Sequence, residues 1–301
     1  MLSLIVCTYN RDKFIYRSLQ KIAENGFPVF DYEILLINNN CTDDTERLCQ
    51  QFKVNYPQVQ FRYFIETNQG LSFARNRGIS EAKGDWLIFL DDDAILCPGY
   101  LANLTDYLLT YSDAGAFGGK ITPVFESGES PAWLCRWTYS WVSALDMGRE
   151  VSLFEGKRYP IGANMGISRT VIDKCGLFNT ALGRSKKNLM GGEEKDIFNR
   201  IRSASFPIYY FPNAAVEHVI PPHRTTPDFI ERLGTGIGAS ERLRCKSEGN
   251  SALLKRYVSE MVKWCATIVL WLFYMLSWRP ACGNMLVKFR WNVSTNLFSD
   301  R

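Results

Sequence analysis

Two acidic motifs have the residue types and spacing to do chemistry. Asp91, Asp92 and Asp93 follow directly after the apolar run 86–90, and Glu193-Glu194 follows two glycines. Three like charges repel each other at the end of a buried strand, and a divalent cation would relieve that repulsion. Mg²⁺ and Mn²⁺ are usually held by one or two carboxylates together with substrate phosphates. The D-x-D spacing of Asp91 and Asp93 therefore predicts a metal and nucleotide site, with a solvated turn as the alternative.

Alternating strands and helices are predicted to position these residues. Over the first hundred residues, short apolar runs alternate with segments whose apolar residues recur at helical spacing. Strands are expected at 2–7, 32–37, 59–64 and 85–90, and helices at 12–25, after the cap 42–44, and at 70–83. This order predicts an α/β fold with a mostly parallel sheet covered by helices on both faces.

Polar residues follow all four predicted strands. They are Thr8 to Arg11, Asn38 to Asn40, Glu66 to Gly70, and Asp91 to Asp93. Ligands of open α/β sheets bind outside the carboxyl ends of the strands. The four segments are therefore expected to converge on one site.

The middle of the chain has a weaker pattern. An aromatic-rich stretch at 133–141 suits either stacking on a sugar ring or packing in a core. A strand is expected at 161–168, a helix at 193–203, and short strands at 208–211 and 215–219. Beyond residue 222 the chain is predicted to be helical to its end.

The helical tail contains an uncharged apolar stretch, Trp264 to Trp278. Fifteen helical residues span about 22 Å, which is less than the roughly 30 Å hydrocarbon core of a bilayer. The stretch is therefore either a helix buried against the main domain or an interfacial helix in peripheral contact with a membrane.

Composition indicates a folded protein that does not bind nucleic acid. Of the 301 residues, 46% are hydrophobic and 22% charged, and the net charge is only +4. Nine scattered cysteines form no C-x-x-C pair, which is typical of a reducing compartment. The N-terminus lacks the pattern of a signal peptide. A cytoplasmic protein, peripheral on the inner membrane face if the tail is interfacial, is expected.

Four segments together resemble the ordered motifs of family 2 glycosyltransferases with the GT-A fold. They are Val6 to Arg11, Asn38 to Asp43, Gly70 to Gly78, and Phe89 to Asp93. The resemblance extends from the N-terminus to about Arg224. It implies a Rossmann-like GT-A domain with a nucleotide-sugar-binding half at 1–112 and an acceptor-binding half at 113–224, followed by a helical extension at 225–301.

The resemblance assigns donor-binding roles by position. Thr8, Asn10 and Arg11 are expected to line the base and ribose pocket. Asn38 stands where the family usually has an aspartate that accepts a hydrogen bond from uracil; an amide oxygen still accepts, while its NH₂ donates. Arg75 is expected to approach the nucleotide or its diphosphate.

The same resemblance places the metal, which is expected to be Mn²⁺ or Mg²⁺. Asp93 is the expected direct ligand, Asp91 contacts ribose and metal, and Asp92 contributes to the nucleotide site. His218 is expected either to complete the metal site or to be structural. Arg224 is expected to help hold the diphosphate leaving group.

The second acidic motif resembles the one that supplies the family's general base. A carboxylate there removes the proton from the attacking hydroxyl. Glu194 stands where the family more often has aspartate, so Glu193 and Glu194 compete for the role, and Glu194 is favoured. The alternative is that both acids only cap the helix.

The expected activity is inverting transfer of a sugar from a nucleoside-diphosphate donor, with UDP-sugars favoured, to an acceptor hydroxyl. The acceptor is expected to be a carbohydrate or a lipid-linked sugar of polysaccharide or glycan biosynthesis, as implied by the resemblance. A nucleotidyltransferase is the competing enzyme, but the 8–11 segment has no glycine-rich phosphate loop. A catalytically inactive nucleotide-sugar-binding protein is the non-enzymatic alternative.

Overall fold

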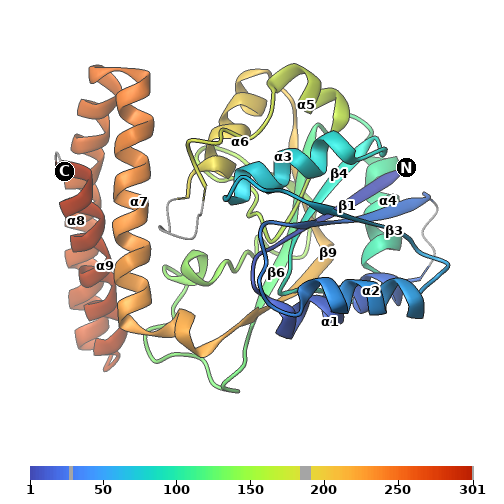
Figure 1. Ribbon diagram of the computed structural model, residues 1–301. Helices are drawn as coiled ribbons and strands as arrows, with labels where there is room; N and C mark the ends of the chain where they lie inside the picture. The colour runs from blue at the N-terminus through green and yellow to red at the C-terminus, as the bar shows by residue number, and fades with distance from the viewer. Residues whose placement is uncertain (27–29, 184–190, 300–301) are drawn as a thin grey trace. The chain divides into compact units, whose positions relative to one another are not determined.

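A computed structural model describes residues 1–26, 30–183 and 191–299 (Figure 1). The elements are, in chain order, β1 Leu2–Thr8, α1 Asp12–Ala23, β2 Tyr32–Asn38, α2 Thr45–Asn55, β3 Gln60–Ile65, α3 Leu71–Glu81, β4 Trp86–Asp91, β5 Ala94–Leu96, α4 Tyr100–Thr110, β6 Ala116–Phe125, η1 Tyr139–Val142, β7 Ser152–Leu153, β8 Asn164–Ser168, α5 Arg169–Cys175, α6 Glu193–Ser203, β9 Ile208–Ile220, η2 Pro222–Thr225, α7 Pro227–Glu248, α8 Asn250–Leu276 and α9 Pro280–Phe298. The predicted α/β fold with a helical C-terminal region is confirmed.

The chain divides into two compact units. The first comprises Met1–Val124, Ser143–Ala181 and Glu193–Val219; the second comprises Phe125–Val142, Leu182–Gly192 and Ile220–Arg301. The first unit contains the sheet and the second contains the three C-terminal helices. The sequence Gly-Arg-Ser-Lys-Lys at 183–187 also predicts a basic loop, and all but its first residue fall outside the described residues. Assignment of functions to 1–112, 113–224 and 225–301 stays a prediction.

The four N-terminal strands form the parallel half of the sheet. The strand order is β3-β2-β1-β4-β8-β6-β9-β5, with β7 paired to β9. β1 pairs in parallel with β2 and with β4, so that Thr8 lies beside Asn38, and Cys7 beside Asp91. The register therefore brings the polar residues after these strands to one edge of the sheet.

The second half of the sheet is antiparallel. β8 runs antiparallel to β4 and β6, and β9 runs antiparallel to β5 and β7. Two short strands were predicted where β9 is continuous, because Pro212 and Asn213 are turn-forming types. β7 pairs with β9 before these residues and β5 pairs with it after them, so neighbouring strands hold the segment extended. The prediction of parallel strands therefore holds only for the first half of the sheet.

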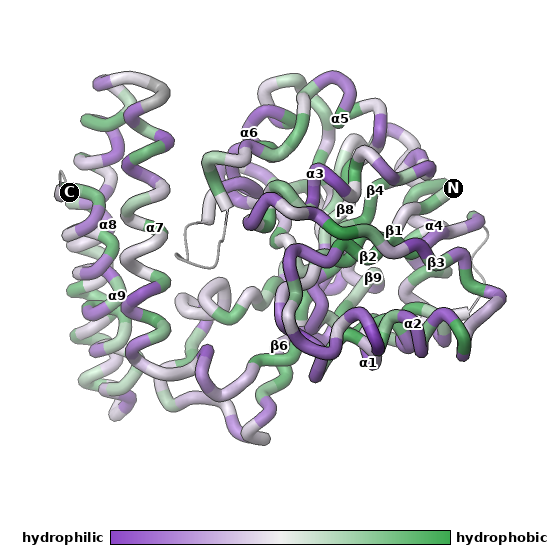
Figure 2. Tube along the Cα trace, in the orientation of Figure 1, coloured by the Kyte–Doolittle hydropathy of each residue, from purple (hydrophilic) through white to green (hydrophobic). Residues whose placement is uncertain are grey.

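Helices cover both faces of the sheet, each over its own hydrophobic cluster. Side chains of α1, α2 and α4 pack on the face that includes Leu4 and Val6, and those of α3, α5 and α6 pack on the face that includes Ile5 and Leu35. Successive side chains of a strand point to opposite faces, which explains this alternation. Figure 2 shows hydrophobic and hydrophilic residues alternating along α1 and α2, as expected of helices with one buried face.

The second unit is built around α9, which packs against both α7 and α8. Two glycines of α7 allow the close contact between α7 and α9. A Cβ atom on Gly238 would overlap with the carbonyl oxygen of Val293, and one on Gly234 would lie 3.1 Å from the Cβ of Asn292. Small residues at these two positions therefore set the spacing of the helices.

Gly238→Ala is expected to lower the free energy of unfolding by about 1–2 kcal/mol, because the added methyl group has no room against α9. Helix propensity alone predicts the opposite sign, a gain of about 1 kcal/mol. Thermal or urea denaturation distinguishes the two. Gly234→Ala, with its looser contact, should cost less; a stabilised Gly238→Ala variant would contradict the packing described here.

Candidate active site

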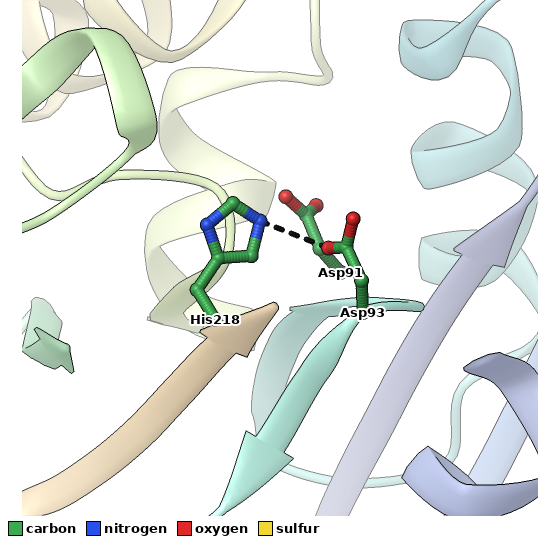
Figure 3. Close-up of side chains that lie close together, drawn as sticks. All are labelled: Asp91, Asp93 and His218. Atoms are coloured by element: carbon green, nitrogen blue, oxygen red, sulfur yellow. Dashed lines mark ion pairs between the residues drawn. The ribbon is translucent and has the colours of Figure 1, made fainter. Parts of the chain in front are cut away.

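An acidic centre lies where β4, β5 and β9 meet. Asp91 ends β4, and the short β5 pairs with β9 so that Ala94 lies opposite His218. The backbone N–H of Val219 donates to the carbonyl oxygen of Asp93 at 2.9 Å. Figure 3 shows the imidazole of His218 directed at Asp93, with Nε2 lying 2.9 Å from Oδ1. Antiparallel pairing thus brings His218 to the aspartates that follow the parallel half of the sheet.

This centre has the donor set of a metal site. One ligand atom each from Asp91, Asp93 and His218 lies within 4.8 Å of the others. Asp93 and His218 are almost completely buried. Two carboxylates and one imidazole are oxygen and nitrogen donors that suit Mn²⁺. The residues present therefore fit a divalent cation, and they include the histidine for which two roles were expected.

Electrostatic repulsion within the aspartate run favours a bound cation. Burial, and then the charge of Asp93, raise the pKa of Asp92 to about 7, while Arg11 acts in the opposite direction. Arg11 Nη2 lies 3.4 Å from Asp93 Oδ2, and its Nε lies 4.0 Å from Asp92 Oδ1. One guanidinium group thus faces a cluster of carboxylates, and a divalent cation would lower the energy of the cluster further.

Arg75 joins the two acidic motifs. Its Nη1 donates to Glu193 Oε1 at 3.1 Å and its Nη2 donates to Glu194 Oε1 at 3.2 Å. Burial alone would lower the pKa of Arg75, but the charges of Glu194, Glu193 and Asp91 outweigh it and raise the pKa above its usual value. The charges of the D-x-D motif and of the Glu193-Glu194 motif therefore act on the same buried guanidinium group.

The two glutamates differ in exposure. The side chain of Glu194 is 23% exposed, whereas that of Glu193 is 3% exposed. Oε2 of Glu193 is buried and has no hydrogen-bond partner among the described residues. Glu194 Oε1 also accepts from the backbone N–H of Gly162 at 3.0 Å. Glu194 is thus the more solvent-accessible of the two acids, and the choice of Glu194 over Glu193 as the general base stays a prediction.

The predicted donor-pocket residues at the ends of β1 and β2 are engaged with protein groups. The amide of Asn38 donates to the Tyr63 hydroxyl at 2.6 Å, and its Oδ1 accepts from the backbone N–H of Cys41 at 2.7 Å. Asn10 has a positive φ of 51°, and its Oδ1 accepts from the backbone N–H of Thr42 at 2.8 Å. Base recognition by Asn38 would use the remaining lone pair of its oxygen.

Two further predicted residues have simpler settings. Thr8 is buried at the end of β1. Its hydroxyl group opposes the rise in the pKa of the neighbouring Asp92 carboxyl group. Arg224 lies in η2, which belongs to the second unit. The donor-binding roles of Thr8, Asn10, Arg11, Asn38 and Arg224 all stay predictions.

Sequence reasoning missed two residues at the centre of the site. A Cβ atom on Gly162 would overlap with the guanidinium group of Arg75 and the carboxylate of Glu194, so a larger residue here would displace both groups. Cys7 lies at the end of β1 near Arg75 and Asp91, and burial raises the pKa of its thiol to about 12. Cys7 is therefore a neutral packing residue of the site. Neither residue has a recognisable signal in a single sequence, because both depend on contacts between distant segments.

Comparisons with known proteins agree with this geometry. The model of glycosyl transferase family 2 matches residues 3–176, which are more than half of the chain. A GalNAc(5)-diNAcBac-PP-undecaprenol beta-1,3-glucosyltransferase of Campylobacter jejuni is 33% identical over 105 residues, which are 34% of this chain and 33% of that protein. A glucosyl-dolichyl phosphate glucuronosyltransferase of Haloferax volcanii is 24% identical over 80% of this chain and 76% of its own length.

A solved structure supports the fold assignment. The mannosyltransferase PcManGT of Pyrobaculum calidifontis, solved with GDP-Man and Mn²⁺, superimposes with a TM-score of 0.66 at 16% identity, covering 100% of this chain and 88% of that one. At this identity the similarity establishes the GT-A fold alone. The family model covers residues 3–176, which include β4 and the aspartate run, and this match establishes the family. The chain belongs to glycosyl transferase family 2.

Proposed function

We propose that this protein is an inverting, metal-dependent glycosyltransferase that moves a sugar from a nucleoside-diphosphate donor to an acceptor hydroxyl. The main support is the position of Arg75. Its guanidinium group donates hydrogen bonds to Glu193 and Glu194, and the charge of Asp91 raises its pKa. A cation site and a candidate base are thereby adjacent, as in-line displacement requires.

Each residue of the site has a distinct role in this proposal. Asp91, Asp93 and His218 would hold the Mn²⁺ or Mg²⁺, which would neutralise charge that develops on the departing diphosphate. Glu194 takes the proton from the acceptor hydroxyl. Arg75 and the N–H of Gly162 hold Glu194 Oε1 and so orient the carboxylate. Glu193 fixes Arg75 from its buried side.

The preferred donor is proposed to be a UDP-sugar, and a panel of nucleotide sugars tests this. Thermal unfolding is measured with UDP-, GDP- and dTDP-sugars, each with and without Mn²⁺. The largest stabilisation is expected with a UDP-sugar and Mn²⁺, because only a ligand that binds the folded state raises its midpoint. Equal responses to all three nucleotides would contradict the base preference, and a metal-independent response would contradict the metal site.

An inactive nucleotide-sugar-binding protein would give the same stabilisation, so turnover is measured separately. Release of nucleoside diphosphate from the donor that stabilises most is followed with and without EDTA. Metal-dependent release is expected. Binding without any release, across acceptors of several classes, would favour the non-enzymatic alternative. Membership of family 2 leaves the nucleotidyltransferase reading without support.

The acceptor is proposed to be a lipid-linked carbohydrate used at a membrane surface. The names of both relatives refer to lipid-linked substrates, an undecaprenyl diphosphate in one and a dolichyl phosphate in the other. Among the described residues, α8 is long and apolar enough to cross a membrane by length and composition, and 17% of its apolar window is buried. Charged Arg256, Glu260 and Lys263 occupy its first half, which favours contact with a bilayer surface over a span.

The cellular location follows from the same proposal. All nine cysteines are free thiols, which suits a reducing compartment. We place the protein at the cytoplasmic face of a membrane, with 1–112 binding the donor, 113–224 the acceptor, and the apolar stretch 264–278 contacting the lipid.

A further inference from the structure

The second unit contains an apolar pocket with a volume of about 480 Å³. Trp137 and Trp141 line it together with residues of α8 and α9. The ring of Trp141 stacks on Phe289 of α9, with 4.2 Å between ring centroids. This volume lies within the range of about 300–1,000 Å³ that is typical of small-molecule sites. Lys263 and Arg290 are the charged residues of its lining.

These two cations differ in how their charges are balanced. Arg290 Nη1 lies 3.1 Å from Glu260 Oε1. Arg256 takes the other carboxylate oxygen of Glu260 and also contacts Glu241. In the part of the chain that the structure describes, the ammonium group of Lys263 has no hydrogen-bond or ion-pair partner.

The surroundings of Lys263 disfavour its charge. Burial, and the positive charges of Arg256 and Arg290, lower the pKa of its ammonium group to about 8, against the opposing effect of Glu260 and Glu241. A half-buried ammonium group without a partner is costly, and a bound anion would compensate for it. The pocket thus presents an uncompensated positive charge beside apolar walls.

An exposed apolar face of α8 adjoins this pocket. Its residues recur at spacings of three and four and so lie on one side of the helix. They are Leu254, Val258, Met261, Val262, Ile268, Val269, Leu272, Phe273 and Leu276. Val269 belongs both to this face and to the lining of the pocket. An apolar chain that leaves the pocket therefore meets an apolar surface.

We propose that this pocket holds the phosphate-bearing end of a long-chain lipid, with the phosphate at Lys263 and the chain along the apolar face of α8. The inference rests on the proposed function, because it names the part of the lipid-linked acceptor that the second unit binds. The positive charge of Lys263 favours an anionic ligand, and the apolar walls of the pocket favour a ligand with a hydrocarbon chain. A neutral sugar would leave Lys263 uncompensated, and a small soluble anion would leave the indole and aliphatic walls unused.

Calorimetric titration of the full-length protein tests the proposal with three single-chain probes. Farnesyl phosphate is expected to bind roughly tenfold or more tightly than farnesol, because only the phosphate pairs with the lysine. Dodecyl phosphate distinguishes the lipid source. Weaker binding than farnesyl phosphate would identify an isoprenoid phosphate, and equal binding would identify a phosphorylated chain of any type. Equal binding of farnesyl phosphate and farnesol would overturn the proposal.

Lys263→Met is expected to reduce affinity for farnesyl phosphate roughly tenfold and to leave farnesol binding unchanged. The matched control is Lys255→Met, which removes an exposed lysine of the same helix that is absent from the pocket lining. It should bind both probes as the wild type does. The Lys263→Met protein should unfold at the same or a higher temperature, because the change removes an uncompensated charge. Loss of binding therefore cannot result from misfolding. Undiminished binding by Lys263→Met would refute the role of the lysine.

The wild-type protein is also titrated with the UDP-sugar and Mn²⁺. A donor response without binding of farnesyl phosphate would contradict this inference alone. Binding of farnesyl phosphate without a donor response would contradict the proposed function alone.

Discussion

Asp93→Asn is expected to abolish the Mn²⁺-dependent stabilisation by nucleotide sugars and to lower the rate of transfer at least about 10³-fold. Metal-assisted charge stabilisation contributes several kcal/mol to such reactions, and each 1.4 kcal/mol corresponds to a factor of about ten. The substitution replaces an anionic ligand with a neutral amide of the same shape. Because Asp93 is 1% exposed and lies beside His218, the lost charge cannot readily be replaced from solvent.

The Asp93→Asn protein should remain folded, since the amide has the shape of the carboxylate and keeps an oxygen beside His218 Nε2. Thermal unfolding without ligand checks this, and titration with donor and Mn²⁺ measures the loss. Asp85→Asn is the matched control, because Asp85 precedes β4 and its side chain is 84% exposed. The control should respond to donor and metal as the wild type does. An undiminished metal response in Asp93→Asn would remove Asp93 from the metal site.

Glu194→Gln is expected to preserve donor binding and to lower transfer by roughly 10²–10⁴-fold, the usual contribution of a positioned general base. An amide of the same size keeps an oxygen for Arg75 and Gly162 but cannot take the proton of the acceptor hydroxyl. The donor-dependent thermal shift should stay within error of the wild type. Product formation, measured at saturating donor, should fall without a matching rise in the KM for the donor.

Glu193→Gln separates the two glutamates. Glu193 is buried against Arg75, so its neutralisation leaves a buried guanidinium group partly uncompensated and should cost about 3–5 kcal/mol of stability. Glu194→Gln, at a partly exposed carboxylate with Glu193 still in place, should cost much less. The opposite pattern, with a stable but inactive Glu193→Gln protein and an active Glu194→Gln protein, would assign the base to Glu193.

The sequence alone determined the parallel half of the fold and the position of the aspartate run. Strands β1 to β4 are short apolar runs with helices between them, and this local pattern is sufficient to predict a parallel sheet. Asp91 and Asp93 follow a buried strand, where parallel sheets place their ligands. Glu193 and Glu194 open a helix whose predicted bounds match α6. Each of these features depends on residues that are close in sequence.

Only the tertiary structure decided which distant residues meet. The pairing of β5 with β9 places His218 against Asp93, and this register has no local signal. The same is true of Arg75, whose contact with both glutamates arises from the packing of α3 near α6. In the second unit, Lys263 belongs to an apolar helix in the sequence, and only the packing of α9 beside α8 gives it an apolar pocket and an uncompensated charge. Long-range pairing and close packing depend on the whole chain at once, which is why a local pattern could not reveal these contacts.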